Sequence, residues 1–233
     1  MRSPILFIPI ATTGVALAFA AVIARRYRER GGTHLLWWSA GMLTFAAGTL
    51  TESATSLLGW HEGVFRAWYI TGALLGGAPL AQGTVYLLFD RRVADRLALL
   101  LLAAIGFGTV AVLLSPLNYG LVEPYRLTGR VLGWHWVRMI SPFINTYAAA
   151  FLIGGAIVSA IRFRRRAETR HRYLANIYIA VGALLPGIGG TFTRFGHTEV
   201  LYVTEFFGLL LIYTGYRLST GSPSPVLKEA QAN

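Results

Sequence analysis

The sequence predicts an all-helical, polytopic integral membrane protein with seven transmembrane helices, and two observations carry this prediction. Of the 233 residues, 55% are hydrophobic and only 13% are charged, whereas a soluble domain has about 25% charged residues. The charges also fall in clusters that separate long apolar segments. Helices are the open-ended elements whose backbone groups are satisfied within lipid, so each long apolar segment predicts one membrane-spanning helix.

Seven such segments follow one another along the chain. In order they are Pro4–Ala24, Leu35–Leu58, Ala67–Phe89, Leu97–Leu117, Ile140–Ile161, Tyr173–Phe192 and Leu201–Tyr216. The first contains no charge and is about 31 Å long at about 1.5 Å per residue, which matches a hydrocarbon core of about 30 Å. The second carries one charge, Glu52, and the third, fourth and fifth carry none. Pro186 interrupts the sixth, and Glu205 is the single charge of the seventh.

Basic residues predict the orientation of these helices. With the N-terminus outside, 15 of the 21 lysines and arginines fall in cytoplasmic segments and the other six in outer segments. Because basic residues are enriched in cytoplasmic segments, we expect the N-terminus outside and the C-terminus inside. The six tryptophans lie at predicted helix ends or in loops, as in an interfacial aromatic belt. The chain is therefore expected to form one transmembrane domain over residues 1–218, followed by a short, disordered cytoplasmic tail over residues 219–233.

The net charge of +11 does not indicate nucleic-acid binding, because most of the excess lies between apolar segments and orients the chain in the bilayer. The densest basic cluster follows the fifth segment and includes Arg162, Arg164, Arg165 and Arg166. Such a cluster is typical of segments that bind anionic lipid headgroups, although setting the topology is its simpler role. The expected partners are thus the lipid bilayer and anionic headgroups at its cytoplasmic face.

Two carboxylates within the predicted spans are the strongest functional signal, because ionised groups in hydrocarbon are costly and generally face the interior of a bundle. Glu52 and Glu205 both lie in the outer third of the membrane, at similar depth. Further polar residues are expected near that depth or at the outer helix ends: Asn145, Tyr147, Tyr202, Arg138 and Arg194. Our hypothesis is that these residues line an outward-facing, ligand-binding pocket. The alternative is a set of structural contacts, such as a bond from an arginine to a glutamate.

Glycine and proline residues in two of the segments predict special helix geometry. Pro186 removes an internal hydrogen bond and predicts a kink in its helix. Three glycines follow it: Gly187, Gly189 and Gly190. They allow a hinge, or unwound backbone that offers carbonyl groups to a ligand, and the alternative is a static kink that packs closely. In the third segment, small residues recur four positions apart, which is typical of close helix packing in membranes. They include Gly72, Gly76 and Gly77.

Several kinds of function lack support in the sequence. The chain has no cysteine, so disulfides and thiol chemistry are absent. Its five histidines lie in loops or at helix ends, where axial ligation of a membrane haem is disfavoured. Lys228, the single lysine, lies in the tail, so a retinal Schiff base in the last helix is excluded. No nucleophile and base pair is recognisable either. We therefore predict no enzymatic activity, no cofactor and no metal site.

A succession of motifs resembles a known family. In chain order the motifs are Gly133–Trp136, the basic stretch Arg162–Arg172, Gly182–Gly187 and the segment around Thr204, Glu205 and Phe206. This order is similar to that of the seven-helix sensor module found N-terminal to bacterial histidine kinases and diguanylate cyclases. The resemblance implies a receptor-like module of the bacterial cytoplasmic membrane that perceives a small or lipidic ligand and transmits through its last helix.

The resulting functional prediction is a stand-alone, receptor-like membrane protein with a ligand pocket near Glu52 and Glu205. Because the chain ends soon after Arg217 and that end contains Pro223 and Pro225, we expect its output to pass to a separate partner protein. An alternative is an accessory or structural subunit of a larger membrane complex. A small proton-linked transporter that uses one of the two glutamates is the third possibility.

Overall fold

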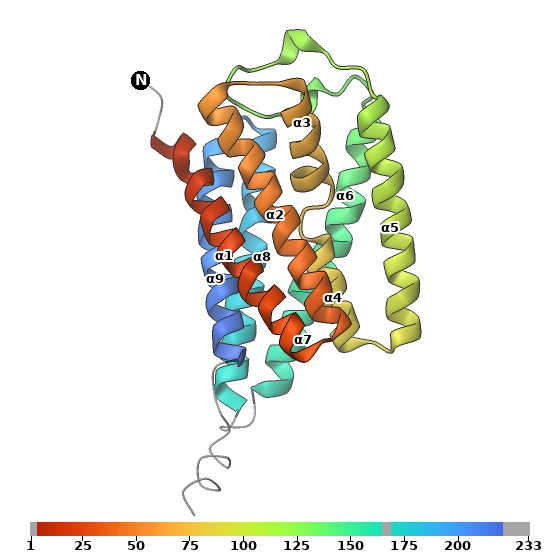
Figure 1. Cartoon of the computed structure of the whole chain (residues 1–233), viewed down its shortest axis with the longest axis vertical. Coiled ribbons are helices and arrows are strands. Elements are labelled where there is room, and N and C mark those ends of the chain that lie inside the picture. The colour runs from red at the N-terminus through yellow and green to blue at the C-terminus, as the bar shows by residue number, and fades with distance from the viewer. Residues whose placement is uncertain (1–3, 165–168, 221–233) are drawn as a thin grey trace, which may run out of the picture.

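Helices make up every regular element in the part of the chain that the computed structural model describes, residues 4–164 and 169–220 (Figure 1). The elements are η1 (Pro4–Phe7), α1 (Ile8–Arg30), α2 (Thr33–Leu58), α3 (Glu62–Trp68), η2 (Tyr69–Leu74), α4 (Ala78–Leu88), α5 (Arg91–Leu114), η3 (Tyr119–Leu121), η4 (Gly129–Val131), α6 (Val137–Ala148), η5 (Ala149–Ile153), α7 (Gly154–Phe163), α8 (Arg170–Arg194) and α9 (Thr198–Thr220). The all-helical prediction is confirmed for these residues.

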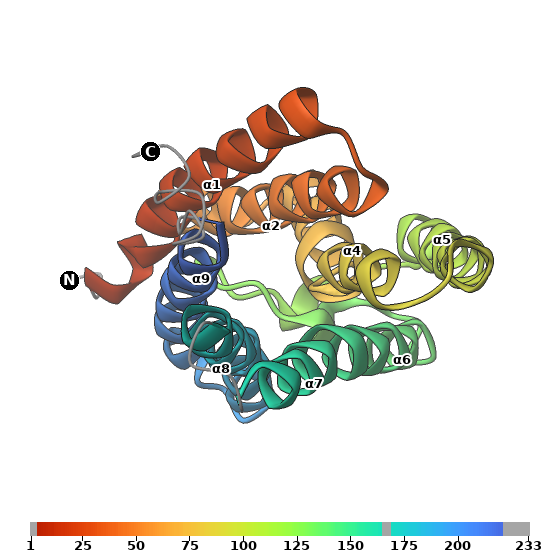
Figure 2. The ribbon, with the colours of Figure 1, turned by 90° about the horizontal axis from the view of Figure 1, so that it is seen from below.

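The helices form a closed ring, which Figure 2 shows from below. Helix α1 packs on α2, α2 on α4, α4 on α6, α7 on α8, α8 on α9, and α9 returns to α1. Helix α5 lies outside this ring against α4 and α6. The elements α3, η2 and α4 follow one another along the bundle, as do α6, η5 and α7 (Figure 1).

Four helical segments are long and apolar enough to cross a membrane: Ile8–Arg30, Arg91–Leu114, Val137–Phe163 and Arg170–Thr193. They correspond to the first, fourth, fifth and sixth predicted spans. Helix α5 is the clearest of the four, because large apolar side chains such as Leu99 and Leu100 are exposed along it, as lipid-facing side chains are. Helices α2 and α9 fall short by composition, since glutamate, hydroxyl and glycine residues recur in both. By length and composition, these four helices are candidate membrane spans.

The third predicted span, Ala67–Phe89, is not one continuous helix. Helix α3 passes into η2, a π-helical stretch, and a turn then separates η2 from α4. Gly76 lies in this turn at φ +47°, a backbone conformation that side chains disfavour. Pro79 stands in the first turn of α4, where its missing N–H group costs nothing. The prediction of an uninterrupted helix was wrong here, because Gly76 and Pro79 together stop one helix and start the next.

The small residues of this span do pack closely. A methyl group added at Gly48 of α2 would lie 3.2 Å from the Cα atom of Gly72. Gly77 faces Ala148 and Leu152 at ordinary contact distance. Gly72 and Gly77 therefore have the packing role that their spacing indicates, whereas Gly76 forms the turn.

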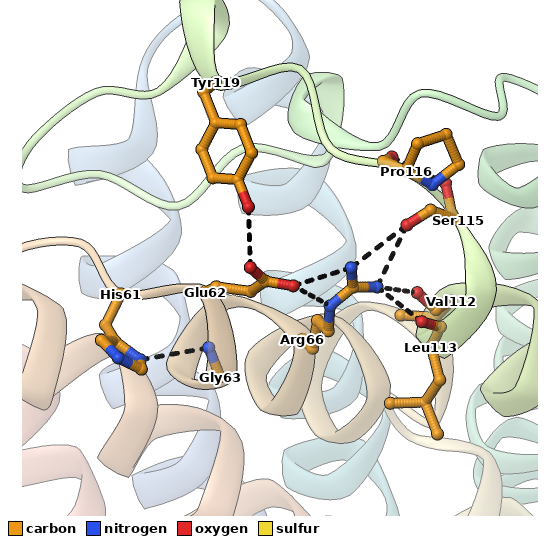
Figure 3. Close-up of polar contacts among 9 residues, drawn as sticks. All are labelled: His61, Glu62, Gly63, Arg66, Val112, Leu113, Ser115, Pro116 and Tyr119. Atoms are coloured by element: carbon orange, nitrogen blue, oxygen red, sulfur yellow. Dashed lines mark hydrogen bonds and ion pairs between the residues drawn. The ribbon is translucent and has the colours of Figure 1, made fainter.

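Arg66 joins α3 to the end of α5 (Figure 3). Its guanidinium donates hydrogen bonds to the carbonyl oxygens of Val112, Leu113 and Ser115 at 2.5 to 3.2 Å. The last carbonyl groups of a helix have no partner within the helix, and a cation there is favoured by the helix dipole. Glu62, one turn earlier in α3, accepts from Arg66 at 2.9 Å and from the hydroxyl of Tyr119 at 2.7 Å.

The connection between α5 and α6 covers the same end of the bundle. Its residues Leu127, Val131 and Leu132 are buried against Phe65 and Trp68 of α3. The backbone N–H of Trp60 donates to the carbonyl of Pro124 at 2.7 Å, which ties the connection to the end of α2. Arg126 ties it to the turn between α8 and α9, where its guanidinium donates to the carbonyl oxygen of Gly196 and the hydroxyl of Thr198.

The pairing of α8 with α9 depends on glycine residues. A methyl group added at Gly182 would lie 2.6 Å from the carbonyl oxygen of Gly208, and one added at Gly208 would meet the Gly182 carbonyl at the same distance. Gly215 approaches the carbonyl oxygen of Ala175 equally closely. We call these contacts the α8–α9 seam. Backbones can approach this closely only where side chains are absent, as is common between membrane helices.

Helix α8 continues through Pro186 from Arg170 to Arg194. The alternative of unwound backbone at this proline was therefore wrong. The three following glycines differ from one another, because Gly189 contacts Thr204 and Leu201 of α9, whereas Gly187 and Gly190 face open space. Packing explains Gly189; a hinge at Pro186 stays a prediction.

The described arginines are unequally divided between the two ends of the bundle. The connections α1–α2, α4–α5 and α7–α8 lie together at the lower end in Figure 1 and carry most of them, including Arg162 and Arg164, which are exposed. Arg66, Arg126, Arg130 and Arg138 lie at the upper end. Arg165 and Arg166 of the predicted headgroup cluster fall outside the described residues.

We predict that Gly182→Ala destabilises the protein, although glycine to alanine in a helix interior normally gains about 1 kcal/mol. The new methyl group would stand against the Gly208 carbonyl, so α8 and α9 must move apart. Gly190→Ala on the same helix is the control, because its methyl group meets open space. Thermal unfolding in mild detergent should give a lower Tm for Gly182→Ala and an unchanged or higher Tm for Gly190→Ala. Equal Tm values for both variants would contradict the seam.

Acid should weaken the contact at Glu62. The hydrogen bond from Tyr119, and then that from Arg66, hold the pKa of the Glu62 carboxyl below its ordinary value. A carboxyl whose pKa is lowered by folding stabilises the folded state above its unfolded pKa, and this stabilisation is lost as the pH falls through the lowered value. Between about pH 7 and about pH 3 the wild type should therefore lose more stability than Glu62→Gln. Unfolding midpoints at the two pH values measure the difference, and parallel losses would show that the contact has no energetic role.

Candidate functional site

Glu52 and Glu205 come together in the structure, which we call the carboxyl pair. Glu52 lies on α2 and is only 4% exposed. It is buried because α2 packs against α1, α3 and α4, and the face that includes Thr49, Ser53 and Ser56 is buried with it. Glu205 lies on α9, partly buried, with its carboxyl within hydrogen-bonding reach of the Glu52 carboxyl.

Trp68 is the donor that fixes Glu52. Its indole Nε1 donates to Oε1 of Glu52 at 3.0 Å, in a contact that is buried. Trp68 is the last residue of α3, and its ring packs among Phe65 and Tyr69. Oε2 of Glu52 is buried as well and receives no hydrogen bond from an N–H group or hydroxyl of the described residues. One oxygen of the carboxyl is thus held by an indole, and the other has no N–H or hydroxyl donor among the described residues.

Tyr202 extends the site along α9. The side chain is 2% exposed, and its hydroxyl interacts with Ser56 of α2. Two polar links therefore join α2 to α9, one through the carboxyl pair and one through Tyr202 and Ser56. No ion pair among the described side chains includes either glutamate.

Asn145 and Tyr147 lie in other contacts. The amide of Asn145 donates to the carbonyl oxygen of Ala73 in η2 at 3.1 Å. The hydroxyl of Tyr147 donates to Oε1 of Gln82, and the Gln82 amide donates to the carbonyl of Ala94 at 3.0 Å. Gln82 is fully buried. This second polar cluster joins α4, α5 and α6, so these two residues support the packing of that side of the bundle.

Of the two arginines expected at the pair, only Arg138 has a described side chain. Arg138, in the first turn of α6, has no hydrogen bond or ion pair to Glu52 or Glu205. The side chain of Arg194 falls outside the described atoms. Arg126, from the α5–α6 connection, lies at this end, and its guanidinium contacts Glu123 at 2.9 Å and Thr198 at 2.9 Å.

A cavity of about 300 Å³ lies at the opposite end of the bundle from the carboxyl pair. Six helices contribute apolar side chains to its wall: Ile23, Trp38, Leu80, Ala156, Ile179 and Ile212. Polar groups are few, and two of them, Arg172 and Asn176, belong to the first turns of α8. The space exists because α7 presents Gly155, Ala156 and Ser159 on this side. Volumes of this order are typical of sites for small, mainly apolar ligands.

Sequence reasoning missed three parts of this arrangement. Trp68 was placed in the interfacial belt because of its position, although its indole N–H is the kind of donor that a buried carboxylate needs. Gln82 gave a signal, as a polar residue within an apolar span, but its partner Tyr147 comes from a distant helix. The cavity had no local signal, because it depends on small residues of α7 that meet helices far apart in the sequence.

The described residues contain no group of three or more histidine, aspartate or glutamate side chains arranged to hold a metal ion. The carboxyl pair brings two oxygen-bearing groups to a site with an indole, a phenol and a hydroxyl around it. Such a set can hold a proton and pass hydrogen bonds between helices. The apolar cavity can hold a ligand. These are two separate chemical capacities at two ends of one bundle.

Trp68→Phe should destabilise the protein by about 1–3 kcal/mol, because it leaves a buried acceptor without its donor. Trp136→Phe is the matched control. Trp136 is exposed in the loop before α6, and its indole N–H donates no hydrogen bond to another helix among the described residues. Chemical unfolding in detergent, followed by circular dichroism, gives both values. A loss for Trp68→Phe no larger than that for the control would mean that Glu52 does not need this donor.

Comparison with known proteins finds no match to the chain among protein-family models, curated proteins or solved structures. The features of the chain that bear on its function are the carboxyl pair, the polar cluster at Gln82 and the apolar cavity.

Proposed function

We propose that this chain is a receptor-like, seven-helix protein of the bacterial cytoplasmic membrane, with its N-terminus outside and its C-terminus inside. Four helices long and apolar enough to span the bilayer support the membrane location. The gathering of arginines at the end that carries the α1–α2, α4–α5 and α7–α8 connections supports the orientation, because that end would be cytoplasmic. The other three predicted spans correspond to α2, to α3 with η2 and α4, and to α9. These segments are shorter or more polar, and they complete the seven spans by packing within the ring.

The observation that carries the receptor-like function is the cavity between α1, α2, α4, α7, α8 and α9. Its wall is mainly apolar, and its polar groups stand near the arginine-rich end. A ligand that fits is therefore small or lipidic, with an apolar body among Ile23, Leu80 and Ile212 and one polar end near Arg172. The proposed ligand site is therefore away from the carboxyl pair, in the half of the bundle opposite to the one expected from the sequence.

A receptor needs an element that senses occupancy, and α9 meets this need. Ile212, Tyr216 and Ser219 of α9 line the cavity, and the helix leads on to the C-terminal segment. A ligand that presses on these residues acts directly on the last helix. We propose that this helix passes the signal to a separate protein partner.

The test is photo-crosslinking of a diazirine-bearing fatty acid to the protein in lipid nanodiscs, with the labelled residues mapped by mass spectrometry. The wild type should be labelled at cavity residues such as Ala156 and Ile179. Ser159→Phe places a ring in the cavity and should reduce this labelling several-fold. Val158→Phe is the control, because the neighbouring Val158 is 44% exposed on the outer surface and does not line the cavity.

Labelling confined to exposed residues such as Leu99, and equal in all three proteins, would contradict the proposal. Stoichiometric recovery of another membrane protein with the wild type, together with an unlabelled cavity, would favour the alternative of an accessory subunit. Both results come from the same purification, so the two functions are separated in one experiment.

A further inference from the structure

The carboxyl pair plays no part in the ligand site and calls for its own explanation. We propose that Glu52 and Glu205 together bind one proton, and that this proton forms the bond that holds α9 to α2. The proton resides on Glu205 and is donated to Oε2 of Glu52. The site is distinct from the cavity and does not depend on the proposed ligand.

Repulsion between two carboxylates is the first reason for a shared proton. Two carboxyl groups within hydrogen-bonding reach cannot both be ionised without strong repulsion, and one shared proton removes it. A cation near the pair would be the alternative source of compensation. The ion pairs of the described residues place their arginines and His197 elsewhere, on Glu29, Glu62, Asp95, Glu123 and Glu199.

The second reason is that the Oε2 atom of Glu52 lacks a hydrogen-bond donor among the described groups. This side chain is 4% exposed, and its Oε2 atom is buried with no N–H or hydroxyl donor among the described groups. A buried acceptor without a donor costs about 1–3 kcal/mol, more where it is charged. A protonated Glu205 supplies the missing donor. Because Trp68 already donates to Oε1, Glu52 is the better acceptor of the two, and this assigns the proton to Glu205.

The groups around the pair leave this proton in place. On α9, Tyr202 is engaged with Ser56, and Glu199 contacts His197 at 3.3 Å. The charge of Arg126, in the α5–α6 connection, has an electrostatic effect on Tyr202 and Glu199. Its guanidinium is bonded to Glu123 and Thr198.

The other elements packed on α2 and α9 bring no charge to the pair among the described side chains. The half of α1 that faces this end offers hydroxyls, of which Thr13 bonds to Thr49. The charged residues of α3, Glu62 and Arg66, are bonded to each other. η1 carries no charged residue, η2 has Tyr69 as its titratable group, and α4 has Tyr86 in its far half. On α8, Arg170, His171 and Arg172 belong to the far end, and the side chain of Arg194 at the near end falls outside the described atoms.

Loss of the shared proton should change the contact between α2 and α9. Helices α2 and α9 both pack on α1, and among the described residues the polar links between them are the carboxyl pair and the contact between Tyr202 and Ser56. Loss of the shared proton turns one link into a repulsion between two carboxylates. Helix α9 should then separate from α2 at this end.

The experiment is infrared titration of the protein in nanodiscs. At neutral pH the wild type should show the carbonyl stretch of one protonated carboxyl, and the band should shift in D2O. Glu205→Gln should lack this band, because glutamine donates to Glu52 through its amide and leaves one ionised carboxyl. Glu199→Gln is the control, since this exposed glutamate of the same helix is outside the pair, and it should keep the band. Absence of the band from the wild type, or its persistence in Glu205→Gln, would overturn the proposal.

A distance measurement tests the mechanical consequence. The chain has no cysteine, so spin labels can be placed at Leu50→Cys and Phe207→Cys, two exposed positions near the pair. In otherwise wild-type protein the distance should widen as alkaline pH removes the proton, and it should stay constant in Glu205→Gln. A distance that is independent of pH in both, while the band titrates, would show that the proton does not hold α9 to α2.

Discussion

Close approach of α8 and α9 is the constraint on which the rest of the bundle depends. In lipid there is little hydrophobic driving force between helices, so association comes from tight packing and from polar bonds. Gly182, Gly208 and Gly215 let the two backbones meet at distances that no side chain allows. Because α9 also packs on α1, this seam closes the ring, and the register of α9 in the ring follows from it.

The seam also determines the position of Glu205. Thr204 lies against Gly189 of α8, and Gly208 lies against Gly182. Glu205 is between these two contacts in the sequence, so its depth in the bundle is determined by glycines on the neighbouring helix. The glutamate reaches Glu52 because α9 is pinned on both sides of it. The packing contact and the polar contact are therefore one structural unit.

Sequence reasoning selected Glu52 and Glu205 because a charge within an apolar span has few alternatives to a buried partner. It placed them at similar depth, since depth along a membrane helix can be counted in residues, but it expected a ligand or an arginine beside them and not a contact between the two carboxyl groups. Tyr202 was selected because it is a polar residue near that depth. The break at Gly76 was missed, since an apolar run of this length has the composition of one continuous span even where a glycine and a proline divide it.

The partners that could not be predicted come from departures from ideal helix geometry. Trp68 directly precedes the π-helical stretch η2, and Tyr147 is two residues before η5, also π-helical. A π turn adds a residue and rotates the side chains that follow relative to those before it. Apolar periodicity carries no information about such a turn, so the bonds from Trp68 to Glu52 and from Tyr147 to Gln82 were beyond sequence reasoning.

Helix α9 connects the two chemical capacities of the bundle. Glu205 bonds to Glu52 at one end, and Tyr216 lines the cavity near the other, about 16 Å away along the helix axis. Tyr216 also packs against Phe19 of α1, so the cavity wall and the α1–α9 contact share one side chain. Because the α8–α9 seam holds α9 at Gly208 and Gly215, between the two sites, α9 cannot bend freely there. A displacement of α9 that begins at the carboxyl pair is therefore carried to the cavity wall, because the pair and the wall share this helix.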